Sequence, residues 1–462
     1  MSSSAAFFDL DRTLIATSSA PVFQRHLSEA GLGGASIPFP ITEVALKFYE
    51  TFGESWVMMQ PAKLGVKASD GWSIDTLAMA MKPAAAELES MLAPFAKIQF
   101  DRHRAQGDKL VLATTSPAPM VRPLAERLGF DAVLATEWSD DGTHYDGSND
   151  GPFVWGKAKE QAAKDWADSN SIDMSTSYAY SDSYFDSPLL DAVGNPVAVN
   201  PDARLAGVAL LRGWPIRHLD RSEGIIKLGP LEPQEWARPL TRPELIRFAD
   251  IQISGTENIP KTGGAIIVFN HRSYFDPAVV ILVGAKAGRS LRGLGKREIF
   301  DIPLIGGLLK GLGGVPVNRG SGSDQPIEAG VDAVKGGEVL LLAPQGTIPR
   351  GEAFFDPVLK GRWGAAKIAA ESKAPVIPIG LWGTEKVWPR SAKFPNVMPR
   401  TKPIVTAVVG PPVELKYRSP NADTKRIMAA ISELLPEESR TKQNPTEDEL
   451  RLTYPSGHSP DQ

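Results

Sequence analysis

Short apolar runs rich in β-branched residues recur along the chain, with helix-like stretches between them. The first half contains AAFFDL, KLVLATTS, DAVLATE, TSYAYSD and NPVAVN, and the second half contains GAIIVFN, EVLLLAPQG, APVIPIGL and PIVTAVVG. Strands that alternate with helices in this way favour a parallel sheet covered by helices. We therefore expect both halves to be α/β.

The length of 462 residues exceeds what one ordinary core supports, so two domains are expected. The proline-rich stretch LGPLEPQEWARPLTRPE indicates a boundary. We predict a first domain at 1–220, a linker at 221–244, a second domain at 245–435 and a flexible tail at 436–462. The strand-poor stretch after the first strand predicts a helical cap at about 16–105.

The composition excludes several classes of function. The net charge of −4 predicts no general attraction to nucleic acid, so no nucleic-acid partner is expected. The absence of cysteine excludes disulfides, thiolate metal sites and cysteine nucleophiles, and it fits a reducing cytoplasm. The charge pattern of MSSSAAFFDLDRTL is not that of a signal peptide.

No apolar run reaches the roughly 18 residues that a membrane-spanning helix needs. The nearest candidates, PAVVILVGAKAG and IPLIGGLLKGLGGVPV, are shorter and are interrupted by Lys286 or Lys310. Each has two interpretations: a helix buried in the core, or a surface helix that dips into one face of a bilayer.

The stretch FFDLDRTL places Asp9 and Asp11 at the end of an apolar strand. At the carboxyl end of a parallel strand, such residues face the crevice where ligands bind. Two adjacent carboxylates repel each other and need a cation or a shared proton. Mg²⁺ would leave one carboxylate free as a nucleophile toward phosphorus, and the other could act as the acid and base.

Three further segments carry polar residues that suit phosphate chemistry. Thr114 in KLVLATTS could hold a phosphate oxygen, and Lys159 in WGKAK could balance the phosphate charge. A third strand ends in Asp182 and Asp186, which suit the neighbourhood of a metal ion. The residues alone leave alternatives open: Thr115 and Ser116 for Thr114, and Lys157 for Lys159.

This ordered set resembles the haloacid dehalogenase-like phosphatases, in particular the phosphoserine-phosphatase-like branch, over roughly 5–215. The resemblance implies a Rossmann-like domain with a helical cap, and its spacing favours Lys159. The implied roles are the nucleophile for Asp9, the acid/base for Asp11, phosphate binding for Thr114 and Lys159, Mg²⁺ binding for Asp9, Asp11 and Asp182, and support of the metal site for Asp186.

In FNHRSYFDP, His271 and Asp276 are five residues apart. On a regular helix, about 100° per residue would separate them by roughly 140°, so a hydrogen bond between them requires a turn. The sequence allows a turn after the strand and a helix that begins near Pro277. From spacing alone, Asp276 could equally orient His271 or cap that helix.

The stretch FNHRSYFDP resembles the NHxxxxD motif of the glycerolipid acyltransferases, and the resemblance runs from about 245 to 415. It implies a C-terminal α/β acyltransferase domain in which His271 is the general base and Asp276 orients it. It also implies an acyl donor, acyl-CoA or acyl carrier protein. GVPVNR supplies Arg319 for the acceptor phosphate, and LLLAPQGTIPRG keeps Gly346 and Thr347 of the family block FPEGTR.

Two departures from that block concern the acceptor. The chain has Gln345 and Ile348 where the family has glutamate and arginine. Losing the arginine removes a bidentate phosphate contact. Arg350 is a candidate substitute, with a surface role as the alternative. Lysophosphatidic acid is the first choice of acceptor, ahead of another lysophospholipid or a monoacylglycerol.

Together, the two resemblances imply a bifunctional enzyme that makes phosphatidic acid and hydrolyses a phosphomonoester. The phosphatase substrate could be phosphatidic or lysophosphatidic acid, or a small soluble phosphate. The alternatives are a regulatory N-terminal module beside an acyltransferase, and a C-terminal membrane-docking module for a phosphatase. We expect a cytoplasmic protein attached peripherally to the inner face of the cell membrane. The sequence gives no oligomeric state.

Overall fold

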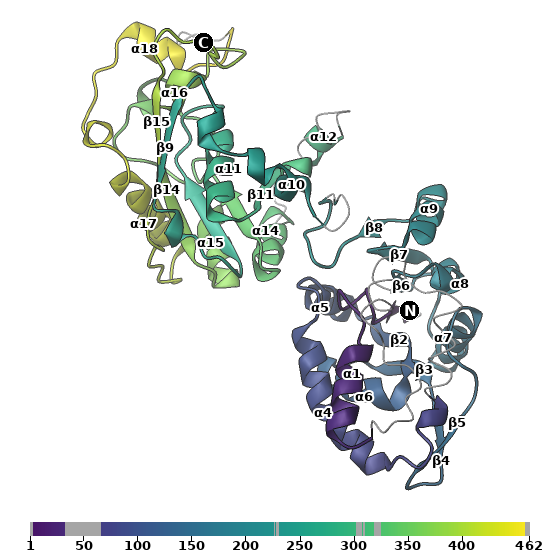
Figure 1. Cartoon of the computed structure of the whole chain (residues 1–462). Helices are drawn as coiled ribbons and strands as arrows, with labels where there is room; N and C mark the ends of the chain where they lie inside the picture. Colours follow the sequence, from purple (N-terminus) through teal and green to yellow (C-terminus); the bar gives the residue numbers. More distant parts are fainter. Residues whose placement is uncertain are drawn as a thin grey trace. The chain divides into compact units, whose positions relative to one another are not determined.

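A computed structural model describes residues 3–32, 66–225, 227, 231–301, 307, 310–317 and 325–457. Its contacts divide the chain into two units, which are both shown in Figure 1. Unit 1 is Met1–Asp220, and unit 2 is Arg221–Gln462. Each unit has its own sheet and its own hydrophobic cores.

Unit 1 contains a six-stranded parallel sheet in the order β3-β2-β1-β6-β7-β8. Its strands are β1 (Ala5–Phe8), β2 (Lys109–Pro117), β3 (Ala132–Thr136), β6 (Tyr178–Ser181), β7 (Asn195–Val199) and β8 (Ile216–Arg217). The central β1 is buried throughout. Because β1 is parallel to both β2 and β6, the carboxyl ends of these three strands share one edge of the sheet.

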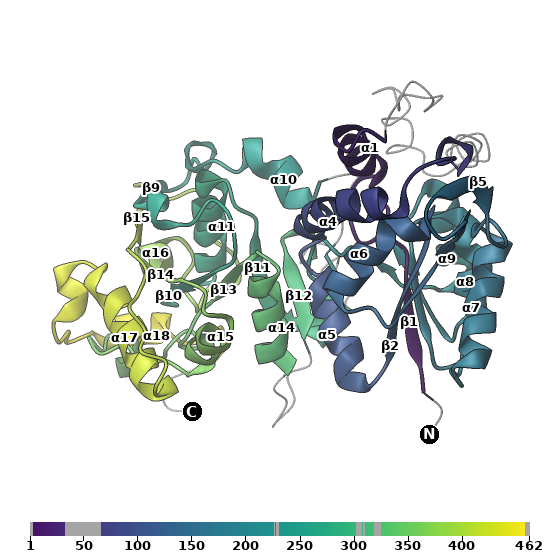
Figure 2. The ribbon, with the colours of Figure 1, turned by 90° about the horizontal axis from the view of Figure 1, so that it is seen from below.

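Helices cover both faces of this sheet, as Figure 2 shows. They are α1 (Ala20–Glu29), α4 (Ile74–Ser90), α5 (Ala96–Gln106), α6 (Ala118–Leu128), α7 (Lys157–Ser169), α8 (Ser187–Ala192) and α9 (Ala203–Arg212). Phe8 packs in one core with Phe100 of α5 and Val121 of α6. Its neighbour Phe7 points to the opposite face, where it packs with Ala163 of α7.

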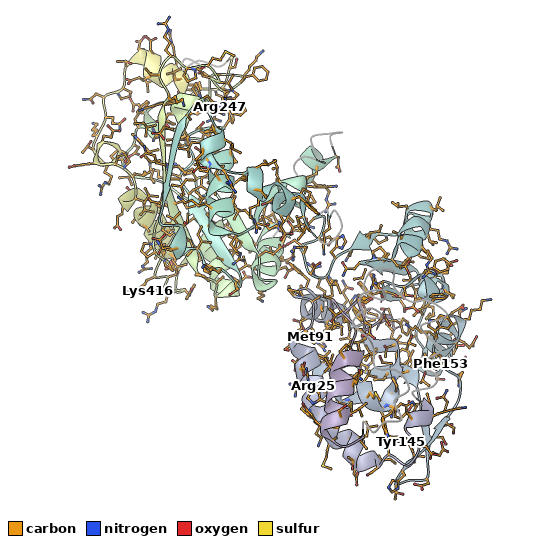
Figure 3. All side chains as sticks on the ribbon, in the orientation of Figure 1. Arg25, Met91, Tyr145, Phe153, Arg247 and Lys416 are labelled. Atoms are coloured by element: carbon orange, nitrogen blue, oxygen red, sulfur yellow. The ribbon has the colours of Figure 1, made fainter. Side chains whose placement is uncertain are left out.

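The region expected to be a cap contributes α1 and α4, and residues 33–65 lie outside the described part. Arg25 of α1, labelled in Figure 3, pairs with Glu87 of α4. A hairpin that the sequence analysis did not predict, β4 (Trp138–Asp140) and β5 (Tyr145–Asn149), bonds to the segment before α4. The last helix of the expected cap, α5, instead packs on the sheet.

A buried polar network lies inside unit 1. Ser4 bonds to Asp108, whose other carboxylate oxygen lies 2.7 Å from His103 Nδ1. His103 Nε2 lies 2.8 Å from the Tyr180 hydroxyl, and the Tyr180 ring stacks on Phe8. Burial lowers the pKa of His103, although Asp108 opposes the shift, and burial raises the pKa of Tyr180. The folded state therefore favours the neutral imidazole.

Unit 2 contains a seven-stranded mixed sheet in the order β12-β11-β13-β10-β14-β15-β9, in which β14 and β15 are antiparallel. Its strands are β9 (Asp250–Ser254), β10 (Ala265–Phe269), β11 (Leu291–Lys296), β12 (Gly314–Val317), β13 (Val339–Leu342), β14 (Val376–Trp382) and β15 (Ile404–Val409). With the parallel sheet of unit 1, this confirms the α/β class expected for both halves.

The helices of unit 2 also lie on both faces of its sheet (Figure 2). They are α10 (Pro233–Ala237), α11 (Asp276–Ala287), α12 (Arg297–Phe300), α14 (Gln325–Lys335), α15 (Gly364–Ser372), α16 (Thr384–Val387), α17 (Pro420–Glu433) and α18 (Glu447–Leu452). The short 3₁₀ turns in the described part of the chain are η1 (Tyr184–Asp186), η2 (Arg238–Leu240), η3 (Pro243–Leu245), η4 (Thr256–Asn258), η5 (Gly351–Phe354) and η6 (Glu437–Arg440). Ile267 packs with Val279 of α11, whereas Ile266 packs with Ile368 of α15 and Ile427 of α17.

The apolar stretch 277–285 forms most of α11, and its buried residues, such as Val279 and Val283, belong to the core. This finding favours the buried-helix interpretation over a surface helix. The second apolar stretch lies partly outside the described residues. None of the helices in the described part is long and apolar enough to cross a membrane.

The segment 221–244, which was expected to be a linker, is packed onto unit 2. Arg292 of β11 is buried and bonds to Glu232 at 2.7 Å and to Glu338 at 2.8 Å. The backbone N–H of Ser222 also donates to Glu338, at 3.2 Å. A buried arginine needs its counter-ions, and one of them comes from this segment.

The segment 436–462 was expected to be a flexible tail, but its described part reaches residue 457 and includes η6 and α18. The Thr453 hydroxyl accepts the backbone N–H of Gly351 at 2.8 Å, and Thr453 is buried. The backbone N–H of Ser391 donates to the carbonyl of Leu452. The end of α18 is thus fixed by hydrogen bonds to unit 2.

The lowered pKa of His103 predicts a pH-dependent stability. A histidine that is buried neutral stabilises the fold fully above its unfolded pKa, about 6.5, and loses this contribution as the pH falls toward its folded value. We expect the melting temperature of the full chain to exceed that of His103→Gln most above about pH 6.5. Thermal unfolding across pH checks this expectation, and a difference that does not change with pH contradicts it.

Candidate active sites

The polar residues at the carboxyl ends of β1 and β6 lie together in unit 1. Lys159 of α7 is almost fully buried, and its Nζ lies 3.0 Å from Asp9 Oδ1 and 2.7 Å from Asp186 Oδ2. The backbone N–H of Asp9 donates to the carbonyl of Tyr180 in β6. The competing Lys157 is exposed. The geometry therefore selects Lys159 as the cation beside Asp9.

Asp182 follows β6 and is buried against the turn after β1. Arg12 Nε lies 2.9 Å from Asp182 Oδ2, and the Thr13 hydroxyl lies 3.4 Å from Asp182 Oδ1. Arg12 has a positive φ of 59°, which turns the chain sharply after Asp11. The sequence analysis did not single out Arg12 or Thr13, although both directly follow Asp11 in FFDLDRTL.

Asp11 is held by the start of α1 and the end of β2. The backbone N–H of Ser19 donates to Asp11 Oδ1 at 2.5 Å, and the Ser116 hydroxyl lies 3.4 Å from Asp11 Oδ2. Burial raises the pKa of the Asp11 carboxyl, and these hydrogen bonds oppose the shift. A carboxyl whose pKa is raised holds its proton up to a higher pH.

The three hydroxyl residues at the end of β2 have different surroundings. Thr114 is buried, and its hydroxyl accepts the backbone N–H of Ser116 at 3.2 Å. The Thr115 hydroxyl is buried and has no hydrogen-bond partner among the described residues. Ser116 contacts Asp11. The structure thus brings Ser116 to the aspartates and does not show Thr114 in contact with them.

The aspartates of unit 1 suit magnesium in their chemistry, because Mg²⁺ takes carboxylate oxygens. Asp186 Oδ1 is buried without a hydrogen-bond partner in the described structure, and Ser181 and Lys159 both bond to Oδ2. However, Lys159 and Arg12 pair with the carboxylates. No group of three acidic or histidine side chains in the described part is arranged as a metal site.

In unit 2, the turn between β10 and α11 wraps around one carboxylate. Asp276 is fully buried, and its Oδ2 lies 2.7 Å from His271 Nδ1. The same oxygen accepts the backbone N–H groups of Arg272 and Ser273 at 2.6 and 2.8 Å. Asp276 is the first residue of α11, and its carboxylate bonds back to the preceding turn. It therefore does not act as the helix cap that was the alternative interpretation.

The His–Asp pair determines the form of the imidazole. A carboxylate accepts hydrogen bonds, so Nδ1 carries the proton and Nε2 keeps a basic lone pair. No described residue bonds to Nε2, and the His271 side chain is 20% exposed. His271 can therefore accept a proton from a molecule that reaches it from solvent.

Neighbouring strands hold this turn in place. The Asn270 side chain exchanges two hydrogen bonds with the backbone of Leu381 in β14, at 2.9 and 2.7 Å. Gln345 Oε1, after β13, accepts the backbone N–H of His271 at 2.6 Å. Gln345 thus supplies an uncharged acceptor at the position where the acyltransferase block has glutamate.

The remaining expected residues of unit 2 lie around the loop after β13. Gly346 has a φ of +74° and an added Cβ would lie 3.1 Å from Arg362 Nε, so this turn requires glycine. Thr347 and Arg350 are exposed, whereas Ile348 is buried. The structure shows no contact of Arg350 with His271 or Asp276. Arg319 lies outside the described residues.

Arg272, which the sequence analysis did not single out, is held beside His271. Its guanidinium lies 4.2 Å from the ring centroids of both Phe354 and Trp382. It also pairs with Glu385 at 3.3 Å. Its partners come from positions that are distant in sequence, so only its place within FNHRSYFDP could have drawn attention to it.

Comparison with known proteins divides the chain in the same way. Residues 6–191 match the family model for haloacid dehalogenase-like hydrolases. Residues 250–382 match the acyltransferase family model.

Three curated proteins illustrate the similarity. The inhibition of morphological differentiation protein of Streptomyces azureus is 36% identical over 225 residues, 47% of this chain and 79% of that protein. Phosphoserine phosphatase SerB1 of Mycobacterium tuberculosis is 30% identical over 246 residues, 49% of this chain and 74% of that protein. The chloroplastic 1-acyl-sn-glycerol-3-phosphate acyltransferase BAT2 of Brassica napus is 32% identical over 149 residues, 32% of this chain and 41% of that protein.

The parallel sheet with Asp9 and Lys159, the mixed sheet with His271 and Asp276, and these matches agree with one another. The chain therefore belongs to the haloacid dehalogenase-like hydrolases through its phosphoserine-phosphatase-like N-terminal domain, which is fused to a C-terminal acyltransferase domain.

Proposed function

We propose that unit 2 transfers an acyl group from a thioester, acyl-CoA or acyl carrier protein, to lysophosphatidic acid and thus forms phosphatidic acid. The observation that carries this proposal is the 2.7 Å contact between His271 Nδ1 and the buried Asp276 carboxylate. The matched relative named as a 1-acyl-sn-glycerol-3-phosphate acyltransferase supports the choice of acceptor. Another lysophospholipid or a monoacylglycerol is the alternative acceptor.

The reaction uses the free nitrogen of the imidazole. His271 Nε2 removes the proton from the acceptor hydroxyl as its oxygen attacks the thioester carbonyl. The bond between carbon and sulfur then breaks, and the thiolate takes the proton back from the imidazolium. Asp276 stabilises the imidazolium and keeps the ring in one orientation. The products are an ester and a free thiol.

We propose that unit 1 hydrolyses a phosphomonoester. Asp9 attacks the phosphorus atom and forms an aspartyl phosphate, while Asp11 gives its proton to the leaving oxygen. Asp11 then removes a proton from the water that hydrolyses this intermediate. Lys159 beside Asp9 supports binding of the phosphate charge, and the Ser19 and Ser116 contacts that hold Asp11 near Asp9 support its acid role.

Asp9, Asp11 and Asp182 are the proposed holders of Mg²⁺, with Asp186 as support. Bound there, the ion would neutralise charge on the phosphate oxygens. The substrate of unit 1 is proposed to be phosphatidic or lysophosphatidic acid, which would connect the two activities. A small soluble phosphate is the alternative, and the relative named phosphoserine phosphatase favours it.

We propose that the protein attaches peripherally to the anionic inner face of the cell membrane through the basic loop, residues 388–403. Phe394 and Met398 of this loop are 79% and 89% exposed. Lys393, Arg400 and Lys402 are exposed beside them, and the sequence contains no acidic residue from 386 to 413. Exposed apolar side chains among cations suit an anionic lipid surface.

His271→Ala tests the acyltransferase proposal. Loss of a general base lowers rates by about 10²- to 10⁴-fold, so formation of phosphatidic acid from lysophosphatidic acid and acyl-CoA should fall by that factor. Lipid product analysis measures it, and release of phosphate by unit 1 should not change. His144→Ala, at an exposed histidine of unit 1, is the matched control. Undiminished transfer by His271→Ala would show that the base is misassigned.

Asp9→Asn tests the phosphatase proposal and its substrate. Removing the nucleophile should abolish release of inorganic phosphate, which is measured with phosphatidic acid, lysophosphatidic acid and phosphoserine in separate assays. Asp191→Asn, at an exposed aspartate of unit 1, is the control and should leave release intact. If Asp9→Asn releases phosphate as the unaltered chain does, unit 1 is not a phosphatase of this type.

Co-sedimentation with lipid vesicles tests the attachment proposal. Replacing Phe394 and Met398 by serine should weaken binding to vesicles that contain phosphatidylglycerol by at least about tenfold, because two apolar side chains no longer leave water. Vesicles of phosphatidylcholine alone should bind less even without the substitutions. Leu210→Ser with Leu211→Ser, on the exposed face of α9, is the control. Equal binding by both double variants would exclude the basic loop as the attachment site.

A further inference from the structure

Arg390, in the basic loop after α16, is a buried cation that pairs with no acidic side chain among the described residues. It is only 8% exposed, and its Nη1 donates to the backbone carbonyl of Ile348. Its Nε is buried and has no hydrogen-bond partner among the described residues. No carboxylate in the described part of the chain pairs with it.

An arrangement of this kind is costly, because arginine cannot lose its proton and a buried charge needs an opposite charge or full hydrogen bonding. Two other arginines of unit 2 show how a buried or partly buried guanidinium is neutralised in this chain. Arg292 is also buried, with 2% of its surface exposed, and is held by Glu232 and Glu338. Arg272 is paired with Glu385. By this comparison, Arg390 has no anionic partner in the described part of the chain.

Arg390 also connects two segments that bond to the His–Asp turn. Its partner Ile348 comes three residues after Gln345, which accepts the backbone N–H of His271. The carbonyl of Trp388, two residues before Arg390, accepts the Ser273 hydroxyl at 2.6 Å. An anion bound by Arg390 would therefore lie near the segments that hold the His–Asp turn.

We propose that Arg390 binds the phosphate group of the acyl acceptor. It would supply, from a distant part of the sequence, the guanidinium that is missing at Ile348. Ile348 is buried in the apolar interior, and the Arg390 side chain lies on the backbone of the same residue. A guanidinium suits phosphate because its N–H donors match two oxygens at once. This inference rests on the proposed acyl transfer by unit 2.

The test compares acceptors with and without a phosphate group. Lysophosphatidic acid and monoacylglycerol are presented in the same detergent micelles, so that binding of the protein to a membrane does not affect the measured KM. Arg390→Gln should raise the KM for lysophosphatidic acid about tenfold to a hundredfold, the range expected for lost charge-assisted hydrogen bonds. The kcat for lysophosphatidic acid and transfer to monoacylglycerol should change little. Arg390→Lys keeps the charge but loses the paired N–H donors of the guanidinium. Its KM for lysophosphatidic acid should therefore lie between those of the unaltered chain and Arg390→Gln.

Controls separate this role from a structural one. Arg418→Gln, at an exposed arginine of the same unit, should leave both acceptors unaffected, and Arg350→Gln tests the substitute expected from the sequence. Equal loss with both acceptors would show that Arg390 only holds the Ile348 loop. A raised KM for acyl-CoA alone would assign the phosphate to the donor, and no change would also overturn the proposal.

A binding measurement separates failure of this inference from failure of the proposed function. If the unaltered chain transfers acyl groups to neither acceptor, calorimetry with glycerol 3-phosphate still tests Arg390. Weaker binding by Arg390→Gln than by Arg418→Gln would support the phosphate site without the reaction. Equal binding by these two variants would overturn it.

Discussion

Charges that leave water have to be neutralised, and this constraint shapes both units. In unit 1, Lys159 lies between Asp9 and Asp186, so a single buried cation balances one carboxylate that follows β1 and one in the turn after β6. In unit 2, the Asp276 carboxylate is met by an imidazole and two backbone N–H groups. The local backbone around each site follows from these contacts.

Parallel strands bring the reactive residues together. The first polar residues after β1 and β6 lie near one another because these strands are neighbours with the same direction. In unit 2, β10 lies between β13 and β14, so the turn that holds His271 can bond to Gln345 on one side and to Leu381 on the other. Two unrelated chemistries thus use the same property of α/β sheets.

The sequence analysis predicted what depends on local pattern. Apolar runs predicted strands, strand ends predicted the positions of Asp9, Asp182 and His271, and the five-residue spacing required the turn before Asp276. It could not predict contacts between distant segments. One example is the Glu232–Arg292 pair, which joins the expected linker to β11. Another is the contact of Arg272 with the rings of Phe354 and Trp382. Both could be predicted only by knowing which loops meet. The polar strands of the β4–β5 hairpin also lacked an apolar run that would have indicated them.

Tyr180 takes part in three interactions at once. Its ring stacks on Phe8, its hydroxyl meets His103, and its carbonyl accepts the N–H of Asp9. Substitutions at these positions should therefore not be additive in their effects on stability, and a tolerated change at one should alter which changes the others accept. Related chains should vary here jointly or not at all, because Tyr180 contacts both the core and the backbone of Asp9.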